Sequence, residues 1–160
     1  MITLVDAISG PRIATARTLF EEYAATLGVS LCFQDFDAEL AQLPGKYVAP
    51  TGALLLALEG ESALGCVALR PLQAEAVAPI AELKRLYVRP PGRGRGLGRQ
   101  LTEAALARAR AAGYRRVRLD TLATMHEAQG LYRALGFREI AAYCHNPIAG
   151  TLYMELEWPD

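Results

Sequence analysis

Glycine occupies every second position from residue 92 to residue 98, in the run Gly-Arg-Gly-Arg-Gly-Leu-Gly-Arg that ends at Arg99. The run follows the apolar segment 86–88 and leads into a stretch of helical periodicity over 97–112. A glycine-rich turn at a helix N-terminus exposes backbone N–H groups, and the helix dipole favours negative charge there. The chain is thus predicted to contain a strand–turn–helix unit whose turn binds a phosphate or pyrophosphate.

Two common phosphate motifs do not fit this run. The dinucleotide motif G-x-G-x-x-G fails because Leu97 or Arg99 stands where its last glycine belongs. The triphosphate loop needs Lys-Ser or Lys-Thr, and the chain contains neither dipeptide. The pattern Q/R-x-x-G-x-G/A does fit, at Arg93, Gly96 and Gly98.

Hydrophobic periodicity and turn residues divide the chain into eleven segments in the order β α α β β β α β α β β. The strands are predicted at 2–8, 52–59, 63–72, 80–88, 117–122, 137–143 and 151–157. The helices are predicted at 12–27, 35–43, 97–112 and 126–135. This order predicts an α/β (mixed α+β) fold: a mixed central sheet of about seven strands, flanked by about four helices.

Length and composition predict a single folded domain over residues 1–160. Hydrophobic residues make up 52% of the chain and charged residues 21%, which is typical of a globular protein. No apolar run approaches the length of a membrane span, and the N-terminus lacks the pattern of a signal peptide. The three cysteines, Cys32, Cys66 and Cys144, are odd in number and widely spaced, so we expect reduced thiols in a cytoplasmic protein.

Charge is distributed unevenly although the net charge is zero. Residues 84–118 hold eleven basic residues and one acidic residue, whereas residues 1–83 hold ten acidic and four basic residues. This asymmetry suggests that one face binds an anion and another meets a neutral or cationic group. A nucleic-acid surface is an alternative for the basic segment, but the stacking aromatics typical of such surfaces are scarce in it.

Three motifs make the chain resemble the GNAT superfamily of acetyl-CoA-dependent N-acetyltransferases. They are the strand and loop over 82–98, the strand over 118–122, and the segment 128–137, which is similar to the family signature A-x-x-L-Y-x-x-L-G-F. They occur in the family's order and spacing, so the resemblance covers nearly the whole chain. One departure is Met125, which stands where many relatives carry an asparagine that contacts the cofactor.

The resemblance implies acetyl-CoA as cosubstrate and no metal. The strand would bind the pantetheine arm through the main chain of Leu86, Tyr87 and Val88. The loop would hold the pyrophosphate through its amides and arginines, at Arg93, Gly94, Arg95, Gly96, Leu97, Gly98 and Arg99. In relatives a bulge separates two central strands and opens a slot for the thioester, so a backbone N–H near Leu86 would meet the developing oxyanion.

The resemblance also suggests two catalytic side chains. Tyr132 would protonate the departing thiolate, since a phenol is protonated at neutral pH; the alternative is a core tyrosine. Glu82 lies eleven residues before Arg93, where some relatives place the carboxylate that deprotonates the amine. The alternatives are an ion-paired glutamate and proton removal by ordered water. His126 and His145 are weaker candidates for substrate contact, and a Cys144–His145 nucleophile is disfavoured because adjacent strand residues point to opposite faces.

The sequence therefore predicts an N-acetyltransferase that moves acetyl directly from acetyl-CoA to a primary amine of a small molecule or peptide N-terminus. An acyl-CoA-binding sensor of the same fold is the alternative. We expect no nucleic-acid or membrane partner, and a homodimer is open because small members of this family are often dimers. Amino acids, polyamines, aminoglycoside-like amines and protein N-termini all remain as acceptors, and longer acyl donors are not excluded.

Overall fold

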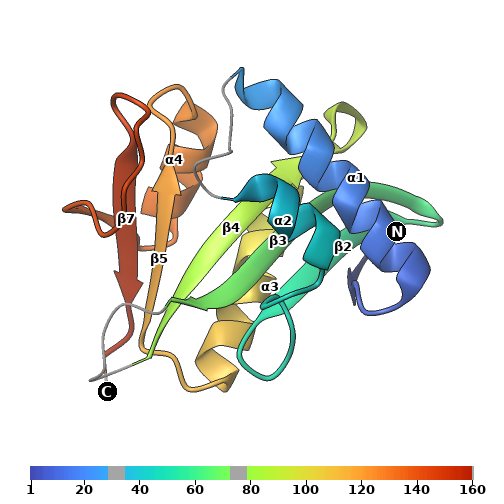
Figure 1. Ribbon diagram of the computed structural model, residues 1–160, viewed down its shortest axis with the longest axis horizontal. Helices are drawn as coiled ribbons and strands as arrows, with labels where there is room; N and C mark the ends of the chain where they lie inside the picture. The colour runs from blue at the N-terminus through green and yellow to red at the C-terminus, as the bar shows by residue number, and fades with distance from the viewer. Residues whose placement is uncertain (29–34, 73–78, 160) are drawn as a thin grey trace.

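The protein is built around one seven-stranded mixed sheet (Figure 1). The computed structural model describes residues 1–28, 35–72 and 79–159. The strand order is β1-β2-β3-β4-β5-β7-β6, and β4 with β5 is the parallel pair among otherwise antiparallel neighbours. The strands are β1 (Ile2–Asp6), β2 (Ala53–Glu59), β3 (Ser62–Leu72), β4 (Ile80–Val88), β5 (Arg116–Thr121), β6 (Arg138–Ile140) and β7 (Leu152–Glu157).

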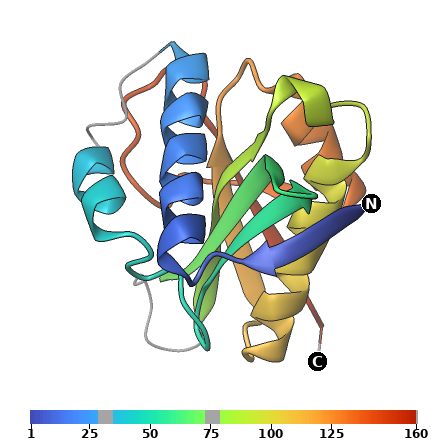
Figure 2. The ribbon, with the colours of Figure 1, turned by 90° about the vertical axis from the view of Figure 1, so that its right-hand side faces the viewer.

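Helices lie on both sides of this sheet (Figure 2). The α-helices are α1 (Gly10–Leu27), α2 (Phe36–Gln42), α3 (Leu97–Ala111) and α4 (His126–Ala134), and a short 3₁₀ turn, η2, spans Pro90–Gly92. α1 and α2 lie on one face, and α3 and α4 on the other. This three-layer arrangement buries the apolar sides of strands and helices together.

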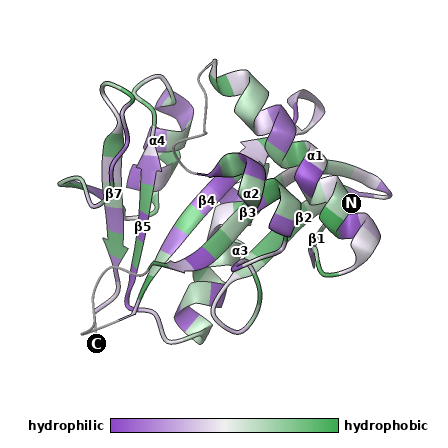
Figure 3. Cartoon of the chain, in the orientation of Figure 1, coloured by the Kyte–Doolittle hydropathy of each residue, from purple (hydrophilic) through white to green (hydrophobic). Residues whose placement is uncertain are grey.

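Two hydrophobic clusters fill the layers on either side of the sheet. The cluster under α1 and α2 includes Leu19, Phe20 and Leu56, and the cluster under α3 and α4 includes Leu101, Leu119 and Met154. Figure 3 shows hydrophilic residues among the hydrophobic ones along β4, β5 and β7. The centre of the sheet therefore carries polar side chains, which a purely structural core strand would not need.

Local sequence signals set the ends of the helices. Ser9 caps α1 by accepting a hydrogen bond from the N–H of Arg12 at 3.4 Å, and Pro11 occupies the first turn, where its missing N–H costs nothing. Gly28 ends the same helix in the left-handed conformation, with φ of 68°. Consecutive prolines after β4 form η2, because proline cannot continue a strand ladder.

The predicted element order and fold class are confirmed, and most boundaries agree within two residues. The main exception is the strand predicted over 137–143, which pairs only over Arg138–Ile140. Beyond it the chain leaves the sheet, and the Tyr143 hydroxyl donates to the carboxylate of Glu82 at 2.7 Å. This side-chain contact replaces the strand ladder that the residue pattern had predicted.

Two irregularities of β4 shape the centre of the molecule. Its parallel pairing with β5 covers Ile80–Glu82 and ends at the pair Glu82–Arg118, after which the two strands diverge (Figure 1). On its other edge, the register with β3 shifts between the pairs Ala68–Lys84 and Cys66–Tyr87, so β4 contains one extra residue there. This bulge and the divergence open the sheet; we call the opening between β4 and β5 beyond Glu82 and Arg118 the split.

Within the described ranges, the helices are too short or too polar to cross a bilayer.

Candidate functional site

A cavity of about 740 Å³ lies where the end of β4 meets the start of α3 and α4. Most of the residues predicted to bind the cofactor line it: Leu86, Tyr87, Val88, Arg93, Gly94, Gly96, Leu97 and Gly98. α1 contributes Tyr23 and Thr26 to its wall, and the start of α4 contributes residues 124–128. The structure thus brings three parts of the chain around one cavity: the end of β4, the glycine-rich segment 92–98, which we call the glycine loop, and the N-terminus of α4.

The backbone of the glycine loop has the geometry of an anion site. Gly94 and Gly96 both have φ of 75°, which L side chains rarely adopt. No atom comes within 4 Å of the place where a Cβ would stand on either glycine. The first turn of α3 follows at once, so unpaired N–H groups and the positive end of the helix dipole border the cavity.

The three arginines of this loop have different surroundings. Arg93 lines the cavity, and its Nε donates to the Val88 carbonyl at 3.1 Å. Arg95 pairs instead with Glu59, and Arg99 pairs with Glu103 one turn along α3. Both of these ion pairs are solvent-exposed, and neither side chain lines the cavity. Their predicted role in pyrophosphate binding stays a prediction.

The bulge of β4 is centred on Arg85, whose φ of 60° is unusual for a residue that has a side chain. Its guanidinium binds the carboxylate of Glu39 through two hydrogen bonds, at 2.9 and 3.0 Å, and stacks over the ring of Phe36. The backbone carbonyl of Arg85 accepts a hydrogen bond from the Cys66 thiol of β3. α2 and β3 together hold β4 in the distorted path that opens the sheet.

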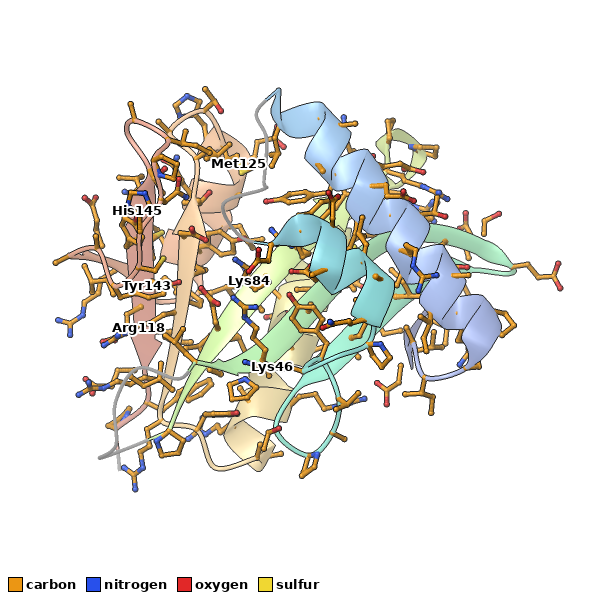
Figure 4. The ribbon with its side chains drawn as sticks, viewed as in Figure 1. Lys46, Lys84, Arg118, Met125, Tyr143 and His145 are labelled. Atoms are coloured by element: carbon orange, nitrogen blue, oxygen red, sulfur yellow. The ribbon has the colours of Figure 1, made fainter. Side chains whose placement is uncertain are left out.

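A small cavity of about 40 Å³ occupies the split itself. Lys84 borders it from β4, Asp120 from β5, Tyr23 from α1 and Tyr132 from α4. Figure 4 shows Lys84 in the space between α2 and β5. The two cavities share four lining residues and therefore adjoin each other: Tyr23, Leu86, Met125 and Ala128.

Tyr132, the predicted acid, borders the split from a position that is also part of the core. Its side chain is buried, and its ring packs against Phe137 at 5.6 Å between centroids. Burial raises the pKa of the Tyr132 phenol well above its usual value, and the nearby Tyr23 and Asp120 act in the same direction. The hydroxyl therefore keeps its proton at neutral pH, as a general acid must.

Glu82, the predicted base, lies in a row of alternating charges across the sheet. Arg70, Glu82, Arg118 and Glu155 occupy paired positions on β3, β4, β5 and β7. The Arg70–Glu82 ion pair measures 2.9 Å and the Arg118–Glu155 pair 2.7 Å. We call these four residues the charge row.

The contacts of Glu82 favour its ionised form. Burial alone would raise its pKa, but Lys84, Arg70 and the Tyr143 hydroxyl together hold the pKa of this carboxyl below its ordinary value. A general base at neutral pH is helped by a raised pKa, so Glu82 is a weak proton acceptor here. It also does not border either of the two cavities described above. Its catalytic role stays a prediction.

The remaining candidates from the sequence occupy distinct places. Met125 precedes α4 and borders both cavities, and His126 borders the larger one. Cys144 and His145 lie on the loop between β6 and β7, and Figure 4 labels His145 there. The Tyr153 hydroxyl donates to the Cys144 carbonyl. Cys144 is exposed, but partial desolvation and the nearby carboxylates of Asp120 and Glu82 raise the pKa of its thiol, which opposes thiolate formation. Cys32 lies outside the described residues.

Much of the basic excess of residues 84–118 is matched by acids from elsewhere in the fold. Within the part of the chain that the structure describes, seven arginines of this segment form ion pairs with acids: Arg85, Arg89, Arg95, Arg99, Arg108, Arg116 and Arg118. Their partners include Glu22 of α1 and Glu39 of α2, in the acidic first half of the chain. The uneven charge along the sequence is therefore largely internal pairing in three dimensions.

The sequence did not predict the two charged residues that border the split, Lys84 and Asp120. A signal was present, because each is a charged residue that directly follows a leucine on a central strand. Such placement puts a charge on an inner face of the sheet, where it is costly unless it has a partner or a function. Among the described residues, no group of three or more His, Cys, Asp or Glu side chains is placed to hold a metal.

Comparison with known proteins gives a consistent result. The profile of the Acetyltransferase (GNAT) family matches residues 16–137. An uncharacterized N-acetyltransferase of Schizosaccharomyces pombe is 42% identical over 88% of this chain and 85% of its own length. An uncharacterized N-acetyltransferase of Escherichia coli, YjgM, is 36% identical over 87% of this chain and 80% of its own.

Solved structures agree on the fold. An acetyltransferase of Streptococcus agalactiae superposes with a TM-score of 0.78 at 23% identity, over 98% of each chain. The yncA protein of Salmonella typhimurium, solved with its cofactor acetyl-CoA, superposes with a TM-score of 0.77 at 19% identity, over 100% of this chain and 95% of its own. With the sheet, the split and the glycine loop in place, this chain belongs to the GNAT family of acyltransferases.

Proposed function

We propose that the protein transfers an acetyl group directly from acetyl-CoA to a primary amine of a small molecule or a peptide N-terminus. The observation that carries this proposal is that the two cavities adjoin and share four lining residues. The larger cavity has a glycine loop and a helix N-terminus for a pyrophosphate, and it lies next to the split beside Tyr132. A donor bound along the end of β4 would have its thioester at the opening.

The residues around the larger cavity fit the parts of acetyl-CoA. The loop amides and Arg93 would hold the pyrophosphate, while the backbone of residues 86–88 would bind the pantetheine arm. Beyond Glu82, the β5 edge of β4 has no strand ladder in the described structure, so its main-chain groups can bind a ligand. Met125 gives the cavity an apolar contact at the place where many relatives carry asparagine.

The reaction needs an amine without its extra proton, a stabilised oxyanion and an acid. The ammonium first loses a proton, and its neutral nitrogen then bonds to the thioester carbonyl carbon. As the C–S bond breaks, the nitrogen loses a second proton to solvent and becomes the amide nitrogen. Tyr132 gives its proton to the leaving thiolate and regains one from solvent. The products are an N-acetylated amine, free CoA and one released proton. A backbone N–H near Leu86, on the bulged strand, is the donor assigned to the oxyanion.

The proton of the amine can be removed by either of two routes. Glu82 could take it through water, but its lowered pKa makes it a weak base. Release to ordered water without a dedicated side chain is the alternative. A Glu82→Gln variant distinguishes them: loss of kcat at neutral pH supports Glu82, and unchanged kcat supports water.

The test of the proposed function is release of the CoA thiol from acetyl-CoA in the presence of a panel of primary amines. The acetylated product is identified by its mass increase. We expect thiol release that depends on both the amine and the enzyme. An acyl-CoA-binding sensor would bind acetyl-CoA and release no thiol with any amine, and that result would refute the proposal.

A further inference from the structure

The four residues of the charge row are paired with one another across the sheet. Arg70 pairs with Glu82, and Arg118 pairs with Glu155. The ring of Tyr143 lies over this row: its hydroxyl donates to Glu82, and the Arg118 guanidinium stacks on the ring at 5.6 Å. Arg85 is bound by Glu39 through two hydrogen bonds. These groups offer a ligand little net charge of either sign.

Lys84 and Asp120 form the next row of the sheet. They lie two residues beyond Glu82 and Arg118 on their strands, so they would be paired opposite each other if β4 and β5 continued as neighbours. The strands separate instead, and the two side chains border the split from its two sides. A positive and a negative group thus flank the opening through which an amine must approach the thioester.

Neighbouring groups determine the environment of both charged side chains at the split, Lys84 and Asp120. Lys84 is 7% exposed, and its burial lowers the pKa of its ammonium below the ordinary value for lysine. The carboxylates of Glu82 and Asp120 oppose this lowering of the pKa, whereas the cations of Arg85 and Arg70 add to it. Asp120 is half-buried, and the Asn146 side-chain amide donates to its Oδ2 at 3.1 Å. Asn146 Oδ1 in turn accepts from the Ile148 N–H, so Asp120 is tied to the loop between β6 and β7.

We propose that the acceptor is a zwitterionic amine, of the amino-acid class, that carries a carboxylate close to its amino group. Asp120 receives the ammonium of the acceptor, and Lys84 receives its carboxylate. The product is then an N-acetyl amino acid, formed with free CoA and one proton by the bond changes given above. This inference rests on the proposed function and names the substrate class of the same site.

Charge balance separates this class from the other amines that the sequence left open. A polyamine or an aminoglycoside brings several positive charges and no carboxylate, and binding it would place a cation beside Lys84. Like charges at short range in a partly buried site disfavour binding, whereas a zwitterion matches both groups. The amide of an amino acid keeps the amine and loses only the carboxylate, so it is the matched probe.

The experiment compares kcat/KM for the twenty common L-amino acids, for the carboxamide of each amino acid that is acetylated, and for spermidine. Three variants accompany the wild type: Lys84→Met, Asp120→Asn and Lys46→Met. Lys46 is the other lysine of the chain and lies on the same side of the sheet but beyond α2, so it is the matched control (Figure 4). Acetyl-CoA affinity, measured by calorimetry, shows whether each variant keeps its fold and donor site.

We expect the wild type to prefer an amino acid over its carboxamide by at least tenfold in kcat/KM. Lys84→Met should bring this ratio close to one with acetyl-CoA affinity unchanged, whereas Lys46→Met should keep the wild-type ratio. Asp120→Asn should lower kcat/KM at least tenfold for both acid and amide.

Several results would overturn the inference. One is a kcat/KM for the carboxamide or for spermidine that equals or exceeds that for the amino acid. Another is a protein that binds acetyl-CoA but acetylates none of the amino acids. A third is a Lys84→Met variant whose ratio of kcat/KM for acid to amide is unchanged. Loss of acetyl-CoA affinity in a variant would show that its side chain supports the donor site and would overturn its assignment to the acceptor. Failure of the wild type to bind acetyl-CoA would refute the proposed function itself.

Discussion

Replacing Tyr132 by phenylalanine removes one hydroxyl and keeps the ring that packs against Phe137. The core contact at 5.6 Å between ring centroids is retained, so we expect the free energy of unfolding to change by no more than about 1 kcal/mol. Truncation to alanine would instead cost about 3–5 kcal/mol, because it leaves a cavity in the core. Phenylalanine therefore separates the role of the hydroxyl from that of the ring.

The kinetic effect should be far larger than the effect on stability. General acid catalysis contributes about 10²–10⁴ in rate, which is about 2.7–5.4 kcal/mol at 1.36 kcal/mol per factor of ten. Because burial raises the pKa of Tyr132, the wild-type hydroxyl stays protonated across the neutral range and its ionisation should not limit kcat below pH 9.

The assay measures thiol release at saturating acetyl-CoA and a fixed amine, together with acetyl-CoA affinity by calorimetry and a urea unfolding curve. We expect Tyr132→Phe to lose at least a hundredfold in kcat with unchanged affinity. If the variant keeps kcat within threefold of the wild type, Tyr132 is only a core residue and the proposed acid is wrong.

Three further predictions concern stability. Gly96→Ala should lower the free energy of unfolding, measured in urea, by about 1–2 kcal/mol, because φ is 75° at this position. Gly98→Ala, in the helix, should be neutral or stabilising, because no atom lies closer than 3.7 Å to the new Cβ. Equal losses in both variants would contradict the loop geometry. Glu82→Gln should lower the free energy of unfolding by about 1–3 kcal/mol at pH 7 and by much less near pH 3. A carboxyl whose pKa is lowered in the folded state stabilises the protein above its unfolded pKa, and this stabilisation is lost as the pH falls. A loss that does not depend on pH would contradict this assignment. Burial raises the pKa of Tyr23 to about 12, so Tm should fall as the pH rises above about 10, where the phenol of the unfolded chain ionises. Tyr23→Phe should reduce that fall in Tm, and an identical fall in the variant would contradict the assignment.

The sequence predicted the parts of the fold that depend on local signals. Glycine and proline mark the ends of the helices and of β4, and hydrophobic periodicity distinguishes strand from helix. The glycine loop was predicted as an anion site for the same reason, since its residues are contiguous and their alternating glycines indicate a tight turn.

What the sequence could not predict depends on pairing between distant segments. The charge row exists only because β4 and β5 are paired in one register, although about thirty residues separate them. The bulge at Arg85 has no glycine to mark it and depends on Glu39 of α2. Likewise, the pairing of Arg95 with Glu59 joins the glycine loop to the end of β2, which is far away in the chain.

The split shows the same limit at the site itself. The family resemblance directed attention to Glu82, whereas the structure places Lys84 and Asp120 at the opening and surrounds Glu82 with partners. Which strand residues face an opening depends on where the ladder between β4 and β5 ends, and no local pattern encodes that point.

The most direct test of the whole account is a calorimetric titration with acetyl-CoA of the wild type, Arg93→Ala and Arg116→Ala. Arg93 lines the larger cavity, whereas Arg116 forms an exposed ion pair with Glu157 at the opposite end of the sheet and controls for the loss of one charge. We predict micromolar binding to the wild type, at least tenfold weaker binding to Arg93→Ala, and wild-type binding to Arg116→Ala. The absence of binding to the wild type, or equal weakening by both substitutions, would contradict the assignment of the glycine loop as the site of acetyl-CoA.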